Sequence, residues 1–501
     1  MNKLKQVLVG CIAFLSVVTY GQVGEYTFNL AGRGAYTTFA TDYQALGINV
    51  GNLGLGIDTG SKRIAIGTSE MGITASSKLF NNTIIKDVRT VPLSFGLSTE
   101  FKYNDYSELA TDLQDGFTAN VNSRLFGGAI SVNKIGTFAF SVTGKYQMSM
   151  GLSQDFSEIL TYGFGAPYFD SLIIQQGSST PFKVQNTPNN YDSLRNDTTT
   201  DILAGTTSDP KSISDLIKGT NMSVSWYREF AFGFGRKIIG IKDIELFAGA
   251  SVKYIQGIAT FELSVDENDE ISTYGAYSPS LNSSGGFLTS GGFKFALPQS
   301  AGQGFGVDLG ATMSYKKKLI VGVAVNDIGS VTWKKNTFTA LGDPLLQTFE
   351  VGGFYADTSA SSVDGPATFD SVLRALINIE ETDEERTIAL PSNFRIGFGL
   401  NLKYFSVGVD IVQPINKDIP GSLEDAIYSF GGTVNLGPIR LSSGAILGGN
   451  YVNRIPFGIV YAPGGRYEVG ISTQDITSVF TFNSAEKPVL SGNIGFARLK
   501  F

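Results

Sequence analysis

Strict two-residue alternation between apolar and polar side chains constrains the fold of this chain more than any other feature. Residues 305–315 carry Phe, Val, Leu, Ala, Met and Tyr at odd positions and Gly, Asp, Gly, Thr and Ser at even positions. Residues 137–150 and 394–404 repeat the pattern. Because successive side chains of a β-strand point to opposite faces, each segment predicts a strand with one apolar and one polar face.

Similar stretches recur along the chain, and lengths of about 9 to 15 residues suit tilted strands that cross a bilayer. Lys316–Lys318 separates residues 305–315 from a second alternating stretch at 319–325, which predicts a β-hairpin. The remaining predicted strands lie at residues 62–74, 91–102, 120–132, 221–235, 244–263, 287–297, 347–355, 405–413, 426–436, 438–448, 455–462, 466–482 and 489–501.

Two architectures share this pattern: a membrane barrel with its apolar faces outward, and a secreted β-sandwich or soluble barrel with its apolar faces packed inward. The polar faces are rich in Gly, Ser, Thr, Asn and Lys, as in a polar lumen, and Tyr146, Tyr315 and Tyr404 end apolar faces as an aromatic girdle does. The stretches are also long for a soluble sandwich. We therefore expect an all-β fold, a transmembrane antiparallel β-barrel of about 14 strands with an even strand number.

The first 21 residues have the composition of an export signal. Lys3 and Lys5 precede an apolar stretch, Val7–Val18, and Gly21 ends a small-residue cleavage site. Cleavage before Cys11, which would leave a lipidated cysteine, is the alternative. The signal predicts a protein of the cell envelope, and the strand pattern places it in the outer membrane.

The domain organisation follows from where the strand pattern stops. We expect residues 1–21 to be the signal peptide, 22–55 a plug segment, and 56–501 the barrel. Three polar insertions, expected as long loops on one rim, lie at residues 152–220, 264–286 and 336–390. Short helices are predicted at residues 107–115, 155–160 and 212–218 and after Thr368, where apolar residues recur at helical spacing.

Composition excludes most kinds of chemistry. The chain has no histidine and a single cysteine, which removes His-dependent nucleophilic catalysis and the common zinc and haem ligand sets. A net charge of −7 argues against nucleic-acid binding. The acidic runs at residues 266–270 and 380–385 lack EF-hand spacing, and the glycine pairs near residues 32–54 do not form a phosphate-binding loop. We expect no enzymatic activity, no metal site and no cofactor.

The polar faces of the predicted strands carry ionisable side chains that we expect in the lumen. These are Asp308, Arg395, Lys403 and Asp410. Charges inside a barrel usually pair across the lumen and set its selectivity.

The chain ends on a strand in which Leu499 and Phe501 share one face and Arg498 and Lys500 share the other. This ending looks like the C-terminal sorting signal of bacterial outer-membrane barrels. The resemblance implies recognition by the barrel-assembly machinery and insertion among outer-membrane lipids.

The segment before the first clear strand carries Asp42, Ala45, Asn49, Asn52 and Leu53. These residues resemble the N-terminal plug of the FadL/TodX-like outer-membrane transporters, typified by the long-chain fatty-acid channel. In this chain a valine replaces the proline of the family's Asn-Pro-Ala sequence. The resemblance implies a plug anchored by Asp42, Asn49 and Asn52, and passive transport of small hydrophobic compounds.

Shorter segments are similar to an uncharacterised, DUF5723-like branch of that superfamily found in Bacteroidetes. They lie at residues 138–142, 155–160, 247–254, 304–310, 327–333 and 390–391. The chain also resembles a secretion-accessory barrel of the same superfamily. This second resemblance leaves open another function, that of a non-transporting barrel in a secretion or gliding machinery, which would bind partner proteins through the long loops.

Overall fold

The computed structural model describes most of the chain outside its first 26 residues. The described residues are 27–58, 61–81, 103–266, 271–279, 299–339, 353–355, 380–417, 419–451, 453–480 and 489–501.

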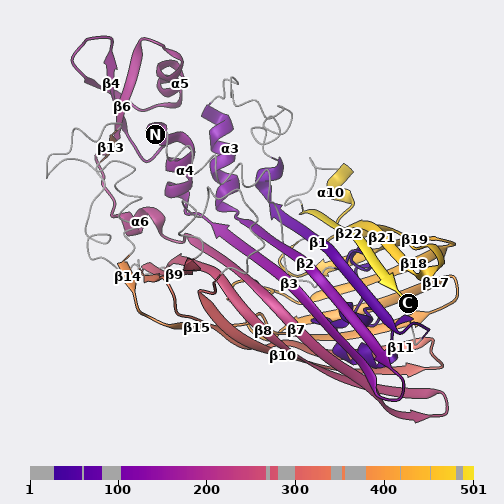
Figure 1. Cartoon of the computed structure of the whole chain (residues 1–501). Coiled ribbons are helices and arrows are strands. Elements are labelled where there is room, and N and C mark those ends of the chain that lie inside the picture. The colour runs from indigo at the N-terminus through magenta and orange to yellow at the C-terminus, as the bar shows by residue number, and fades with distance from the viewer. Residues whose placement is uncertain are drawn as a thin grey trace.

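Fourteen antiparallel strands among these residues close into a barrel (Figure 1). The ring is closed because the last strand pairs with the first, from Ala65 opposite Lys500 to Ser76 opposite Val489. Its strands are β1 (Ile64–Ser77), β2 (Phe117–Val132), β3 (Gly136–Gly151), β7 (Asn221–Ile241), β8 (Ile244–Val265), β10 (Gly302–Tyr315), β11 (Leu319–Trp333), β16 (Asn393–Asn401), β17 (Phe405–Pro414), β18 (Ile427–Leu436), β19 (Ile439–Gly448), β20 (Phe457–Tyr461), β21 (Tyr467–Thr473) and β22 (Val489–Lys500).

The two faces of the barrel wall are oriented as in a membrane protein. Along β10 exposed and buried residues alternate, so that Phe305 is 70% exposed on the outside whereas Asp308 is 0% exposed inside. Other barrel strands also expose large apolar side chains, among them Phe140, Phe232, Val252, Phe398 and Phe430. A closed ring with an apolar exterior and a polar lumen is a transmembrane β-barrel, and the sandwich alternative is wrong.

The hairpin predicted at Lys316–Lys318 joins β10 to β11. Lys316 and Lys317 have φ angles of 51° and 55°, and the Lys318 N–H donates to the Tyr315 carbonyl oxygen at 3.0 Å. Positive φ at both central residues is the geometry of a type I′ turn, whose twist matches that of the paired strands.

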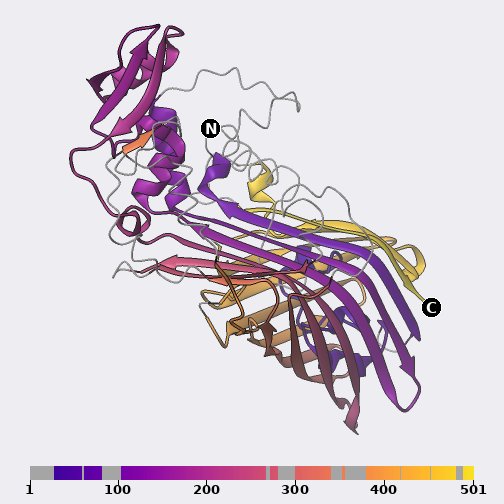
Figure 2. The same cartoon turned by 60° about the vertical axis from the view of Figure 1, so that its left-hand side comes forward.

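The N-terminal segment, residues 27–58, forms a plug inside the barrel (Figure 2). It consists of 3₁₀ turns, η1 (Ala31–Arg33), η2 (Asp42–Ala45) and η3 (Val50–Leu55), joined by irregular chain. The plug backbone lies against the barrel wall, so that a Cβ added at Gly51 would come within 2.8 Å of the Ala311 backbone. Glycine is required there because no side chain fits between the two backbones.

On the rim with the longer connections, four further strands extend the sheet. They are β9 (Ile271–Tyr277), β12 (Thr337–Thr339), β14 (Glu380–Thr382) and β15 (Arg386–Ala389). The insertion 152–220 supplies three strands of a separate four-stranded sheet, in the order β13-β6-β4-β5, which stands beyond this rim (Figure 1). The fourth strand, β13, comes from the insertion 336–390. Its strands are β4 (Ser171–Gln176), β5 (Phe182–Gln185), β6 (Thr200–Thr206) and β13 (Gly353–Tyr355).

Helices gather on the same rim, between the barrel and the small sheet (Figure 1). Helices α3 (Tyr103–Gln114), α4 (Gln154–Tyr162) and α6 (Ile213–Ile217) fall where short helices are predicted. The remaining elements are α5 (Pro188–Asn196), α10 (Thr477–Phe480), η5 (Lys78–Asn81), η6 (Gly163–Gly165) and η8 (Pro463–Gly465). Among the described residues no helix has the length and apolar character needed to cross a membrane.

Several sequence predictions need correction. The described end of the strand predicted at 347–355 is β13, which pairs with β6 in the small sheet and not in the barrel. The strand predicted at 466–482 ends at Thr473, because the Asp475 carboxylate accepts hydrogen bonds from the Thr477 and Ser478 N–H groups and starts α10. The insertion at 264–286 is partly strand, since it contains β9. The strands predicted at 91–102 and 287–297, the helix after Thr368 and the signal peptide lie outside the described residues.

Candidate functional site: the plug and the lumenal charges

Asn49 and Asn52 hold the plug in its fold and against the barrel wall. The Asn52 Nδ2 donates to the carbonyl oxygens of Thr37 and Ala40, both at 2.8 Å, and its Oδ1 accepts from Thr312 Oγ1 at 2.6 Å. The Asn49 Nδ2 donates to Asn52 Oδ1 at 3.2 Å and to Thr312 Oγ1 at 3.1 Å. The Asn49 Oδ1 also accepts from the N–H of Gly51 and so begins η3, without the proline of the related sequences.

Asp42 joins the plug to an ion-pair network at the seam of the barrel. Its carboxylate accepts a short hydrogen bond from the Arg498 guanidinium on β22. The same guanidinium donates to Glu468 on β21 at 2.6 Å, and Glu468 also contacts Lys500 at 2.8 Å and Arg440 at 2.6 Å. The plug, β19, β21 and β22 are thereby linked by charge-assisted bonds, which are stronger than neutral ones.

A second network surrounds Lys253 of β8, which is 0% exposed. Its ammonium nitrogen lies 2.8 Å from Asp308, 2.6 Å from Asp327 and 3.8 Å from Glu229. Asp308 Oδ2 also accepts from the plug's Gly47 N–H at 3.2 Å. Asp308 therefore lies in the lumen and ties the plug to β8, β10 and β11.

Asp410 of β17 holds the plug on the opposite wall. One carboxylate oxygen accepts from the N–H groups of Tyr36 and Thr37, at 2.6 and 2.7 Å. Nearby, the plug's Arg33 guanidinium donates to the Ser406 carbonyl oxygen at 3.0 Å. The Arg33 guanidinium also donates to the Ser406 hydroxyl. On this wall the plug is therefore held by backbone groups and a hydroxyl, and not by close ion pairs.

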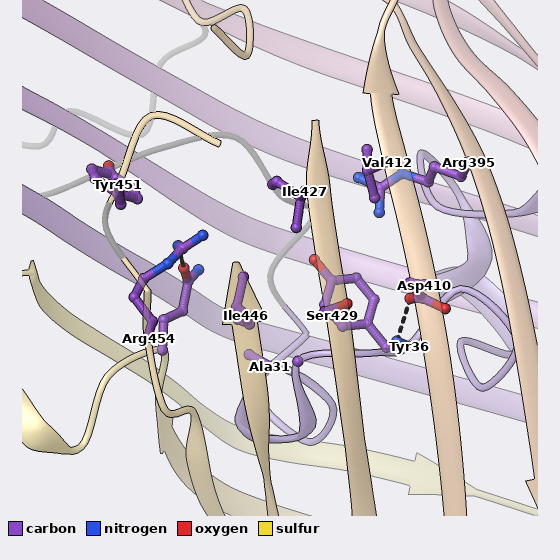
Figure 3. Close-up of a pocket in the computed structure, with 12 residues that line it drawn as sticks. Ala31, Tyr36, Arg395, Asp410, Val412, Ile427, Ser429, Ile446, Tyr451 and Arg454 are labelled. Atoms are coloured by element: carbon purple, nitrogen blue, oxygen red, sulfur yellow. Dashed lines mark hydrogen bonds between the residues drawn. The ribbon is translucent and has the colours of Figure 1, made fainter. Parts of the chain in front are cut away.

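A cavity lies beside this part of the plug (Figure 3). It borders the end of β17, the start of β18 and the end of β19, which lie at the rim with the longer connections. Its unoccupied space is about 550 Å³ with the open mouth included. Arg395 of β16, which is buried, lines the cavity, and its Nε donates to Asn393 Oδ1 at 3.0 Å. The lining consists of Ala31, Gly34, Tyr36, Arg395, Asp410, Val412, Ile427, Ser429, Ile446, Tyr451, Arg454 and Gln474.

A second cavity, against β7, β8 and β11 on the same side of the plug, has a mostly apolar lining. Its unoccupied space is about 320 Å³ with the open mouth included. Trp333 and Leu390 are almost fully buried there, and Tyr227 and Ser225 form the facing wall. The other lining residues are Thr260, Val331, Ile388, Ala389, Pro391 and Pro420.

Lys403 is not a lumenal charge, contrary to the prediction. It is exposed in the turn between β16 and β17, and its ammonium lies 5.0 Å from the centre of the Tyr404 ring. The alternating sequence pattern continues to Tyr404, but β16 ends at Asn401, so the last predicted residues leave the wall.

Leu499 and Phe501 both expose their side chains, 37% and 59%, on the outer face of the barrel. Phe501 continues the pairing beyond β22, because its N–H donates to the Ile64 carbonyl oxygen at 2.9 Å. Their role in sorting stays a prediction.

The sequence analysis gave no role to several residues that tie the plug and the barrel wall together, above all Lys253, Glu468, Arg498 and Arg33. The first three occupy the polar face of a predicted strand, so alternation alone could have placed them in the lumen. Arg33 lies in the plug, where no strand period applies. Among the described residues no group of acidic, histidine or cysteine side chains forms a metal site.

Comparison with protein families gives one match. Residues 193–433 match DUF5723, described as a family of unknown function. The match confirms the predicted resemblance to DUF5723 over that stretch, which runs from α5 to β18. No curated protein matches the chain. The assignment to Bacteroidetes stays a prediction.

Solved structures similar to the chain are outer-membrane barrels of low sequence identity. A TodX deltaS2S3 mutant, titled a monoaromatic hydrocarbon channel, is 9% identical with a TM-score of 0.45, covering 95% of this chain and 98% of that one. The Ralstonia pickettii toluene transporter TbuX is 10% identical (TM-score 0.39; 95% and 98% covered). A Pseudomonas aeruginosa FadL homologue is 10% identical (TM-score 0.37; 96% and 97% covered).

Proposed function

We propose that this chain is an outer-membrane barrel that lets small hydrophobic compounds pass passively, with the plug as its gate. The observation that carries the proposal is the apolar cavity formed by Trp333, Leu390 and their neighbours inside the wall of a membrane barrel. A concave, mostly apolar cavity with a few polar groups is the usual form of a site for a small hydrophobic molecule.

The plug can act as a gate because two different kinds of side-chain contact hold it in place. Asn49 and Asn52 fix its fold through neutral hydrogen bonds, whereas Asp42 binds the wall through Arg498. In the proposed mechanism the neutral hydrogen bonds within the plug stay intact and keep it folded, while the contacts between the plug and the barrel wall break. A compound enters from the rim with the longer connections, which faces outward, and passes when the plug shifts.

Uptake of radiolabelled toluene tests the proposal. Cells that make the protein should take up toluene faster than cells that lack it. Ser225→Phe, which fills the apolar cavity, should reduce the difference at least fivefold. Ser223→Phe is the matched control, because Ser223 lies on the same face of β7 but outside the cavity lining. Equal uptake with and without the protein would contradict the proposal.

A cross-link tests the gate separately. A cysteine at Thr38 of the plug can reach one at Gly322 of β11, since a Cβ at Gly322 would lie 3.4 Å from the Thr38 Cγ2. The same Cβ would lie 2.5 Å from the Asn49 Nδ2, so the Asn49 side chain must move in both forms of the double variant. The oxidised double variant should lose uptake and the reduced one should regain it. The reduced form controls for the substitutions themselves. Undiminished uptake in the oxidised form would mean that the plug does not move.

The accessory-barrel alternative predicts different results. It requires no uptake in any of these strains and co-purification of the chain with a large membrane complex. The rim with α3, α4, α6 and the small sheet would then be the docking region.

A further inference from the structure

Exposed lysines gather on the rim of short turns, although the chain as a whole has a net charge of −7. On this rim, turns of two or three residues join β7 to β8, β10 to β11 and β16 to β17. These three turns carry five exposed lysines, which we call the turn lysines: Lys242, Lys316, Lys317, Lys318 and Lys403.

The turn lysines form one patch because their three turns lie side by side. The Lys316 N–H donates to the Asp243 carbonyl oxygen at 2.7 Å, which joins the first turn to the second. The Asn401 N–H, at the end of β16, donates to the Lys318 carbonyl oxygen at 2.7 Å and joins the second turn to the third. Their positive charges therefore act together on whatever lies beside this part of the rim.

The patch keeps an excess of positive charge after its acidic neighbours are counted. The Asp243 carboxylate lies 3.7 Å from the Lys316 ammonium, and Glu245 pairs with Lys237 at 2.6 Å. Among the described residues no carboxylate oxygen lies within 4.0 Å of the other four turn lysines. The rest of the rim adds further exposed cations, at Arg63, Lys134, Arg236 and Arg466.

The turn lysines lie where the apolar outer band of the barrel ends. The outward side chains beside the three turns are 41–64% exposed and are Ile241, Ile244, Tyr315, Leu319 and Tyr404. Aromatic side chains at the ends of such a band mark the depth of the lipid headgroups. The Lys316 ammonium lies 5.3 Å from the centre of the Tyr315 ring, and that of Lys403 lies 5.0 Å from the Tyr404 ring. Two of the ammonium groups are therefore on the outer surface at headgroup depth.

We propose that the turn lysines bind the phosphate groups of anionic phospholipids in the leaflet beside the short turns. An ammonium binds phosphate as a compact point charge, and each cation near an anionic membrane surface adds to the attraction. A soluble acidic partner would not account for ammonium groups that lie against lipid-facing tyrosines. Because short turns conventionally face the periplasm, the leaflet is the periplasmic one. The inference rests on the outer-membrane barrel and not on the proposed transport.

Spin-labelled lipids test the patch in the full-length protein, reconstituted in phosphatidylcholine vesicles. Labelled phosphatidylglycerol should associate with the barrel at least about twofold more strongly than labelled phosphatidylcholine. Salt at about 1 M should abolish this preference, because it screens charges beyond a few ångströms. The preference should at least halve in a variant with four substitutions, Lys242→Gln, Lys317→Gln, Lys318→Gln and Lys403→Gln.

Two further variants separate the charge of the patch from other effects of substitution. Arginine at the same four positions keeps the charge and should keep the preference. The matched control changes the net charge equally at exposed lysines of the other rim and should also keep it. Its substitutions are Lys183→Gln, Lys211→Gln, Lys334→Gln and Lys417→Gln. Slower migration of the boiled than of the unboiled protein on a gel reports the folded barrel in each variant.

The absence of any preference for phosphatidylglycerol in the unsubstituted protein would overturn the proposal, and so would a preference that the four glutamines leave intact. Labelling with a membrane-impermeant maleimide tests the leaflet, in a Cys11→Ser background. Intact cells should be labelled at Ser178→Cys on the other rim, and at Lys317→Cys only after disruption. Labelling of Lys317→Cys on intact cells would place the patch beside lipopolysaccharide phosphates and overturn the assignment to phospholipid.

Discussion

The two walls of the lumen hold the plug by different means. The wall of β1, β2, β3, β7, β8, β10, β11, β21 and β22 carries ion pairs centred on Glu70, Lys253 and Glu468, and these reach the plug through Asp42 and Gly47. One cation of the Glu468 network, Arg440, comes from β19 of the other wall. The wall of β16 to β20 reaches the plug through Asp410 and Ser406, which accept from backbone N–H groups and from Arg33. The ion-paired wall borders the apolar cavity with Trp333, whereas the cavity with Arg395 lies on the other wall. The two walls therefore differ in how they anchor the plug and in the polarity of the cavity beside each.

The largest effect that this comparison predicts is the loss of stability when Glu468 is replaced. Glu468→Gln removes the carboxylate that Arg498, Lys500 and Arg440 share, and leaves buried cations without full compensation. We expect the free energy of unfolding to fall by about 3–5 kcal/mol. Urea unfolding of the barrel in lipid bilayers measures it, with exposed Glu424→Gln as the control. If Glu468→Gln lowered the free energy of unfolding no more than Glu424→Gln does, the ion pairs of this wall would not be stabilising and the contrast between the two walls would be wrong.

An intermediate effect is expected inside the plug. Asn52→Ala removes two donated hydrogen bonds and leaves the Thr37 and Ala40 carbonyl oxygens buried without them. Leaving buried polar groups without partners costs about 1–3 kcal/mol. The variant also loses the hydrogen bond from Thr312 of β10, but the two donated bonds lie within the plug. Protease cleavage within residues 27–58 should therefore accelerate while barrel migration on gels stays unchanged. Cleavage at the wild-type rate would contradict the anchoring role of Asn52.

The smallest effect is expected on the cavity wall. Arg395→Gln breaks no ion pair, since no carboxylate lies within 4.0 Å of the guanidinium. Arg395 interacts with Asp410 and Asp327 only over longer distances, so the free energy of unfolding should change by less than about 1 kcal/mol. The same urea experiment decides. A loss as large as that of Glu468→Gln would show that Arg395 is a structural anchor.

The barrel could be predicted from the sequence because the alternation of apolar and polar side chains is a local property, and almost every barrel strand shows it. The alternation also placed Asp308, Arg395 and Asp410 in the lumen, for the same reason. It failed at Lys403, where alternation continued past the end of β16 into a turn. The small sheet was missed because its strands are only three to seven residues long, too short to show a clear alternation, and because β13 comes from a distant part of the chain.

Partnerships across the lumen could not be predicted at all. Arg498 and Asp42 are 456 residues apart in the chain, and their contact depends on barrel closure and on the path of the plug. Sequence resemblance named Asp42, Asn49 and Asn52 but gave no partner for any of them. The cavity at Arg395 likewise arises only where plug and wall fail to fill the space between them.

The account rests on the direction in which the strand faces point, and a cysteine scan of β10 tests it most directly. Single cysteines at residues 303–314, in a Cys11→Ser background, would carry nitroxide spin labels in a lipid bilayer. Collision with oxygen, which dissolves in hydrocarbon, should peak at the outward positions Phe305, Val307, Leu309 and Met313 and fall at Gly306, Asp308 and Thr312 between them. The opposite phase, or equal collision rates at odd and even positions, would contradict an apolar exterior around a polar lumen.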